Sequence, residues 1–160
     1  MTRFPAAMLV LALTLSACGG GAGATPKSTF EASKNAVANK DWSALFDLIA
    51  PSARKKMEKE FEDQKKLMDN PESMEAKMLM GMLGISAEEM KNMTMRDMFV
   101  KMMTTATKMN SDEVARMKTA KIVETRIDGD KATMKVKMGD REKTITLVRE
   151  DGKWYMPSMN

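Results

Sequence analysis

Near residue 117 the spacing of the apolar side chains changes, and this change constrains the fold more than any other feature of the chain. Before it, apolar residues recur three and four positions apart, as in residues 42–49, which is the period of an amphipathic helix. After it, residues 132–138 alternate between apolar and polar, as in a half-buried strand. We therefore expect an α+β domain over residues 28–160, mostly helical over 28–117 and β over 118–157.

Capping residues divide the helical part. Ser28 with Glu31 forms a capping-box pattern and predicts a first helix over 29–39. Asp41 is a candidate cap for a short second helix. Prolines are favoured at the first position of a helix, and so they mark possible helix starts. Further starts are predicted at Pro51, Pro71, Ser86 and Thr94, an end at Gly84, and a last long helix over residues 95–109.

Glycine-containing turns divide the β part. The pairs Asp128-Gly129, Gly139-Asp140 and Asp151-Gly152 separate four short stretches that favour strands. Successive strands joined by tight turns predict a curved antiparallel meander of about four strands, with the N-terminal helices packed on its apolar face. Trp42, on a predicted helix face, and Trp154, in the last strand, should both be buried.

The first residues contain a pattern that indicates where the protein is located. Arg3 precedes an apolar run over residues 4–13, then Leu15-Ser16-Ala17-Cys18 and three glycines. The run is too short to span a bilayer. The pattern resembles the lipobox of bacterial lipoprotein signal peptides. That resemblance implies a signal peptide over 1–17, lipid attachment at Cys18, a flexible tether over 18–27, and a membrane partner reached through the lipid anchor. Gly19, in place of aspartate, implies the outer membrane facing the periplasm if the source is Gram-negative.

A second resemblance lies near the C-terminus. Ile127-Asp128-Gly129-Asp130-Lys131-Ala132 and Leu147-Val148-Arg149-Glu150-Asp151-Gly152-Lys153-Trp154 are similar to the final strands of nuclear-transport-factor-two-like, or cystatin-like, domains. The resemblance covers the first helix pair and residues 119–157. It implies helices packed into the concave side of a curved sheet, and it leaves function open because that fold hosts unrelated activities.

The amino-acid composition limits which catalytic and binding sites the chain can form. The chain has no histidine and one cysteine, which removes the usual triads and most zinc sites. Glu124 and Tyr155 are weak candidates for acid–base work, and Asp128 with Asp130 fits a hairpin turn better than a calcium loop. We therefore expect no enzyme, no catalytic residue, no cofactor and no metal site. The net charge of +4 comes from interspersed acids and bases, and so no nucleic-acid partner is expected.

Methionine is the anomaly of this composition. The chain has 20 methionines, most of them between residues 57 and 117. Three interpretations are open. In the helical core the methionines would replace leucine, and on a surface they would form an adaptable apolar groove. As soft thioether ligands they would bind Cu(I). Met74, Met78 and Met82 fall in one helical column, and this spacing favours the core interpretation over the groove and the copper site.

The function that follows is that of a membrane-anchored envelope lipoprotein without catalytic activity. Its domain is expected to bind an apolar ligand, a lipid or a protein partner. The alternatives are a methionine-based Cu(I)-binding protein and, less favoured, a fold-related enzyme.

Overall fold

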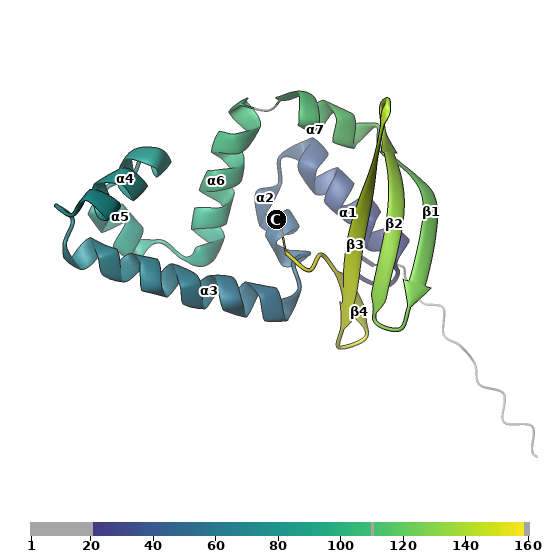
Figure 1. The fold of residues 1–160 in the computed structure, drawn as a ribbon, viewed down its shortest axis with the longest axis horizontal. Coiled ribbons are helices and arrows are strands. Elements are labelled where there is room, and N and C mark those ends of the chain that lie inside the picture. The colour runs from purple at the N-terminus through teal and green to yellow at the C-terminus, as the bar shows by residue number, and fades with distance from the viewer. Residues whose placement is uncertain (1–20, 110, 159–160) are drawn as a thin grey trace, which may run out of the picture.

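The computed structural model describes residues 21–109 and 111–158. Cys18 and the expected signal peptide lie outside this part of the chain. Helices come first and a sheet follows, confirming the α+β class (Figure 1). The elements are α1 (Pro26–Asn39), α2 (Trp42–Asp47), α3 (Pro51–Lys65), the 3-10 turn η1 (Lys66–Asp69), α4 (Met74–Leu83), α5 (Ala87–Asn92), α6 (Met95–Met109), α7 (Ser111–Lys118), β1 (Lys121–Asp128), β2 (Lys131–Met138), β3 (Arg141–Glu150) and β4 (Lys153–Tyr155).

The sheet is an open antiparallel meander in the order β1-β2-β3-β4. Each hairpin turn contains a glycine with positive φ: Gly129 at 56°, Gly139 at 66° and Gly152 at 77°. These angles are why glycine is favoured in tight turns between strands. β1 and β4 are the two edges, and β1 carries a bulge between Ile122 and Glu124.

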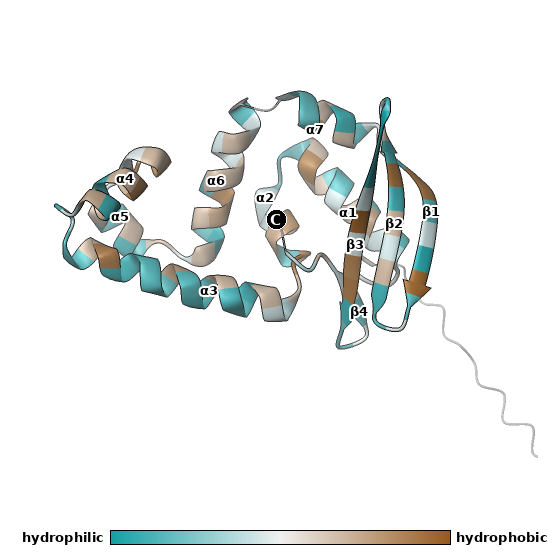
Figure 2. Ribbon diagram, viewed as in Figure 1, coloured by the Kyte–Doolittle hydropathy of each residue, from teal (hydrophilic) through white to brown (hydrophobic). Residues whose placement is uncertain are grey.

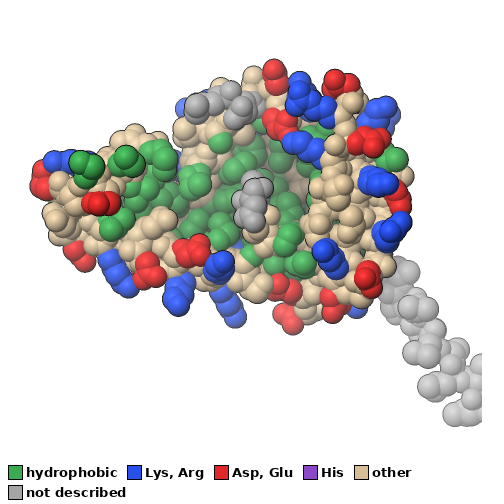
Figure 3. Space-filling model, in the orientation of Figure 1, with side chains coloured by type: hydrophobic (Ala, Val, Ile, Leu, Met, Phe, Trp, Pro, Cys, Tyr) green, Lys and Arg blue, Asp and Glu red, His purple; other side chains and the backbone are tan. Residues whose placement is uncertain are grey.

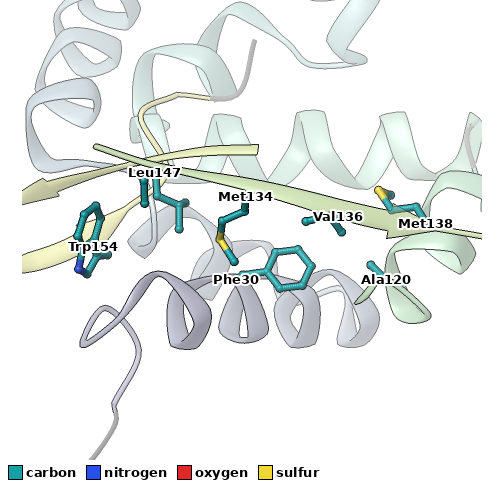
Figure 4. Close-up of a cluster of buried hydrophobic side chains, with 8 residues drawn as sticks. Phe30, Ala120, Met134, Val136, Met138, Leu147 and Trp154 are labelled. Carbon is teal, nitrogen blue, oxygen red and sulfur yellow. The ribbon is translucent and has the colours of Figure 1, made fainter. Parts of the chain in front are cut away.

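One face of the sheet forms a core with α1. Phe30 of α1 points at the side chains of β2, and Leu147 and Trp154 extend this layer along β3 and β4 (Figure 4). Along β2, Ala132, Met134, Val136 and Met138 are buried, and the residues between them face away. Figure 2 shows the resulting alternation of hydropathy on the strands. Trp42 and Trp154 are 4% and 5% exposed, as expected.

α7 lies beside α1 and the sheet, whereas α3 to α6 form an arm that extends away from the sheet, with α4 and α5 farthest from it (Figure 1). A second apolar cluster holds this arm together around Phe61, Met68, Met90 and Met98. A third cluster, containing Trp42, Phe46 and Phe99, joins α2 to α6 in the middle of the molecule.

Capping accounts for most helix ends. Asp41 Oδ1 accepts a hydrogen bond from the Ala44 N–H at 2.9 Å. Ser86 with Glu89 forms a capping box, and Gly84 ends α4 in the left-handed region at φ 61°. Two predicted starts were wrong. α1 begins at Pro26 because Thr25 and Ser28 form the capping box. α4 begins at Met74, not at Pro71, because the Ser73 side chain caps it by accepting from the Ala76 N–H.

The N-terminal segment is bound to the sheet. The backbone N–H of Trp154 donates to the Gly23 carbonyl oxygen at 2.8 Å, and Gly23 is buried. Gly23 has φ +92°, and a Cβ there would lie 3.4 Å from Lys153 Cβ. The folded domain therefore reaches back to Gly23, into the stretch expected to be a tether over residues 18–27.

Candidate functional site

An apolar pocket lies where the helices meet the sheet. Its cavity measures about 270 Å³, just under the usual range for small-molecule sites. Its walls come from α1, α2, α6, α7 and the end of β2. The lining residues are Val37, Trp42, Leu45, Met103, Ala106, Thr107, Glu113, Val114, Met117 and Met138.

The rigid side of this pocket is α2. Asp41 caps the helix, and Trp42 and Leu45 are buried with one face each toward the cavity. The opposite wall is adaptable, since Met103 and Met117 are half-buried thioethers with several rotatable bonds. Thr107 donates its hydroxyl proton to the Met103 carbonyl oxygen at 2.8 Å. That polar group is therefore satisfied within α6 and leaves the wall apolar.

Charge at the pocket is confined to one acid. Glu113, in the first turn of α7, accepts a hydrogen bond from Lys143 of β3. The Lys143 ammonium lowers the pKa of Glu113 below its ordinary value, and so the carboxylate is charged at neutral pH. A ligand for this site would be mostly apolar, with any polar end beside the Glu113–Lys143 pair.

A wider hollow between α3 and α6 has different chemistry. It measures about 700 Å³, but its walls carry Arg54, Glu58, Glu62, Lys65 and Arg96. Although larger, this open and charged cleft is less suited to an apolar ligand than the smaller pocket, because binding there would desolvate several charges.

Arginines tie the elements beside that hollow together. Arg96 of α6 lies 5.0 Å from the centre of the Phe46 ring and donates to the Ser43 carbonyl oxygen at 3.0 Å and to Asp47. Arg54 of α3 lies 5.9 Å from the same ring centre and donates to Asp47 Oδ1 at 3.4 Å. Asp47 thereby joins α2 to both α3 and α6. We interpret this group as structural.

The methionine column on α4 is exposed. Met74, Met78 and Met82 have 78%, 71% and 68% of their surface accessible. The core interpretation was wrong for these three, because α4 packs against the rest of the arm through its opposite face. That face consists of Ala76, Leu79, Met80 and Leu83.

Other methionines do form core. Met134 and Met138 are buried in the core between the sheet and α1, and Met68, Met90 and Met98 are buried in the cluster around Phe61. Among the methionines whose exposure the structure describes, the exposed ones are the α4 column and Met102 of α6, which is 47% exposed. Figure 3 shows hydrophobic side chains gathered over α4 and α6 on one side of the molecule.

The weak acid–base candidates do not come together. Glu124 lies on β1 and pairs with Lys135 at 3.0 Å, whereas Tyr155 lies on β4 at the other edge of the sheet. Asp128 and Asp130 flank the β1–β2 turn, and Asp130 pairs with Arg149 at 2.8 Å. Within residues 21–109 and 111–158, no group of three or more aspartate, glutamate, histidine or cysteine residues has the geometry of a metal site.

Sequence reasoning missed most of the pocket. Val37, Val114 and Glu113 carried no motif, because the pocket forms only when α1, α6 and α7 meet. The usable signal was the apolar spacing within α2 and α6, which includes Trp42, Leu45, Met103 and Ala106.

Comparisons with known proteins do not assign the chain to a family. No family model, curated protein or solved structure matches the chain. In the part of the chain that the structure describes, no helix combines the length and apolarity needed to cross a bilayer.

Proposed function

We propose that this chain is a membrane-anchored envelope lipoprotein whose domain binds an apolar ligand, such as an acyl chain, without catalysis. The pocket between α1, α2, α6, α7 and β2 carries the proposal. A mostly apolar cavity with one ion pair beside it suits a hydrocarbon chain with a polar end. Lipid attachment at Cys18, and an outer-membrane location facing the periplasm if the source is Gram-negative, rest on the lipobox resemblance.

A matched pair of substitutions tests the pocket. Ala106 and Ala115 are both exposed helical alanines, but only Ala106 lines the cavity. Ala106→Phe should fill the pocket and lower the affinity for a fluorescent acyl-chain probe at least tenfold, because the ring occupies the space of the ligand. Ala115→Phe should bind the probe like the wild type. Equal binding by both variants, or no binding by the wild type, would refute the proposal.

The exposed column supports a second candidate function, Cu(I) binding. Met74, Met78 and Met82 present thioethers on successive turns of one helix, and such soft ligands select Cu(I). Replacing all three by leucine keeps volume and apolarity. If the column binds copper, this triple variant loses one equivalent of Cu(I) in competition with a chelator, while Met102→Leu keeps it. No tight equivalent in the wild type would remove this candidate.

A further inference from the structure

Among the described strands, β1 forms one outer edge of the sheet and has apolar side chains exposed. It lies at one end of the strand order, and Val123 and Ile127 are 57% and 56% exposed. Natural edge strands usually carry charges or prolines that discourage pairing with another chain. β1 has four charged residues, Lys121, Glu124, Arg126 and Asp128. Over residues 123–127 its charges alternate with the uncharged residues Val123, Thr125 and Ile127.

The register with β2 assigns these residues to faces. Thr125 pairs with Met134 and Ile127 with Ala132, which belong to the buried face of β2. By alternation, Val123 shares that face, and the bulge at Ile122/Glu124 leaves it outside the pairing with β2. Glu124 and Arg126 pair with Lys135 and Thr133 on the outer face. The open edge thus has an apolar face without a charge and a charged outer face.

We propose that β1 pairs antiparallel with β1 of a second copy about a two-fold axis at Thr125, which joins two sheets into one. This register spans residues 123–127, because the bulge at Ile122/Glu124 ends the alternation of faces. Within it, Val123 lies opposite Ile127 of the other copy, and Glu124 lies opposite Arg126. Two neighbouring registers also keep the apolar faces on the same side, with the two-fold axis at Glu124 or at Arg126. They place Glu124 opposite Glu124 of the other copy, or Arg126 opposite Arg126. Like charges directly opposite one another are destabilising, and so the Thr125-centred register is favoured.

The pairing extends rows that already cross the sheet. Leu147, Ala132 and Ile127 form one apolar row across β3, β2 and β1, and Val123 of the second copy would continue it. On the outer face, Lys135 already pairs with Glu124 at 3.0 Å. Arg126 of the second copy would approach Glu124 from the open side and complete a row of alternating charges. This self-complementarity identifies a second copy as the occupant of the edge.

Cysteine crosslinking tests the register. Thr125→Cys in the full-length chain places two thiols opposite each other on the axis, where Cα atoms of paired strands lie about 4.5–5.5 Å apart. We expect a disulfide-linked dimer with a mild oxidant. Arg126→Cys is the matched control. Residue 126 of the other copy lies diagonally across the strand pair, and the two Cα atoms are more than about 7 Å apart, too far for a disulfide. Wild type, whose one cysteine is Cys18, controls for that thiol.

A charge exchange tests the partner contact. In the Thr125→Cys background, Arg126→Glu should slow dimer crosslinking severalfold. Glu124→Arg, Arg126→Glu and Lys135→Glu together should recover the rate, because Lys135 lies opposite Glu124 in the same copy and must change sign with it. These residues are exposed, so melting temperatures should stay within a few degrees and show that the variants fold. Absence of the dimer, equal crosslinking at residues 125 and 126, failure of the exchange, or crosslinking mainly to a different protein would each overturn the proposal.

Discussion

At the scale of single residues, methionine occupies two environments in this chain. Met90 and Met134 are fully buried, where the flexible thioether fills irregular space left by neighbouring helices and strands. Met74, Met78 and Met82 project into solvent from a helix whose opposite face is also apolar. Exposed apolar patches on a folded domain often mark interaction sites. The exposed column is therefore a surface with a binding role to test.

Peroxide oxidation should separate these two classes. Met74, Met78, Met82 and Met102 are accessible and should become sulfoxides within minutes in the native protein, at rates near those of free methionine. Met68, Met90, Met98, Met134 and Met138 should react at least tenfold more slowly until the protein unfolds. Peptide mass spectrometry over time measures both groups in one sample. Rapid oxidation of the buried group in the native state would contradict the packing described for the arm and the sheet.

Sequence spacing could show that these methionines share a face, but it could not show which face is buried. In α4 both sides are apolar, so the choice depends on where α3, η1 and α6 lie. The tryptophans were easier to predict. Trp42 and Trp154 each belong to a segment with one apolar face, and burying that face is the only way to remove a large ring from water.

At the scale of elements, Asp47 connects three helices. The hydrogen bond from Arg96 is the main reason that the pKa of Asp47 lies below its ordinary value of 3.8, with a further contribution from Arg54. A depressed folded-state pKa gives stability that is present above the unfolded-state pKa of about 3.9 and is lost as pH falls through the folded value. The pair is half-exposed, so its contribution should be modest, about 0.2–1 kcal/mol.

Asp47→Asn should therefore lower the free energy of unfolding by about that amount at pH 7, and the difference from wild type should shrink below about pH 4. Urea denaturation at pH 7, 5 and 3 measures it. Asp140→Asn is the control, because Asp140 is exposed in the β2–β3 turn. A difference that grows as the pH falls would contradict the assigned role of Asp47.

Element boundaries show what local sequence could and could not predict. Ser86 with Glu89 and Thr94 with Asp97 formed the caps expected of them, because those hydrogen bonds join residues three positions apart. The start of α1 was misplaced because Thr25, Pro26 and Ser28 compete with the Ser28–Glu31 pattern for the same turn. Local reasoning could not choose between them. The docking of Gly23 on Trp154, a long-range contact, favours the earlier start.

At the scale of the whole molecule, the position of Gly23 limits how far the domain can move from its proposed anchor. Five residues beyond Cys18 reach Gly23, which spans at most about 18 Å of extended chain. The sheet end would thus stay near the membrane. α4, at the far end of the arm, would be held away from it when the long axis points outward (Figure 1).

Fractionation tests this anchoring. Wild type should sediment with membranes, because two or three acyl chains at about 0.8 kcal/mol per buried methylene give stable attachment. Cys18→Ser should block lipidation and leave the signal peptide uncleaved by the lipoprotein peptidase, which a shift to higher mass would reveal. A wild-type protein found in the soluble fraction would contradict the lipobox interpretation.

The central claim is that an apolar ligand occupies the pocket beside α2, and the fluorescence of Trp42 tests it most directly. Trp42 lines the cavity, whereas Trp154 lies in the sheet core and does not. A brominated alkanoic acid should quench the wild type saturably at one equivalent, and Trp42→Phe should lose that quenching while the Trp154 signal remains. Quenching that does not saturate, or that persists equally in Trp42→Phe, would contradict the claim.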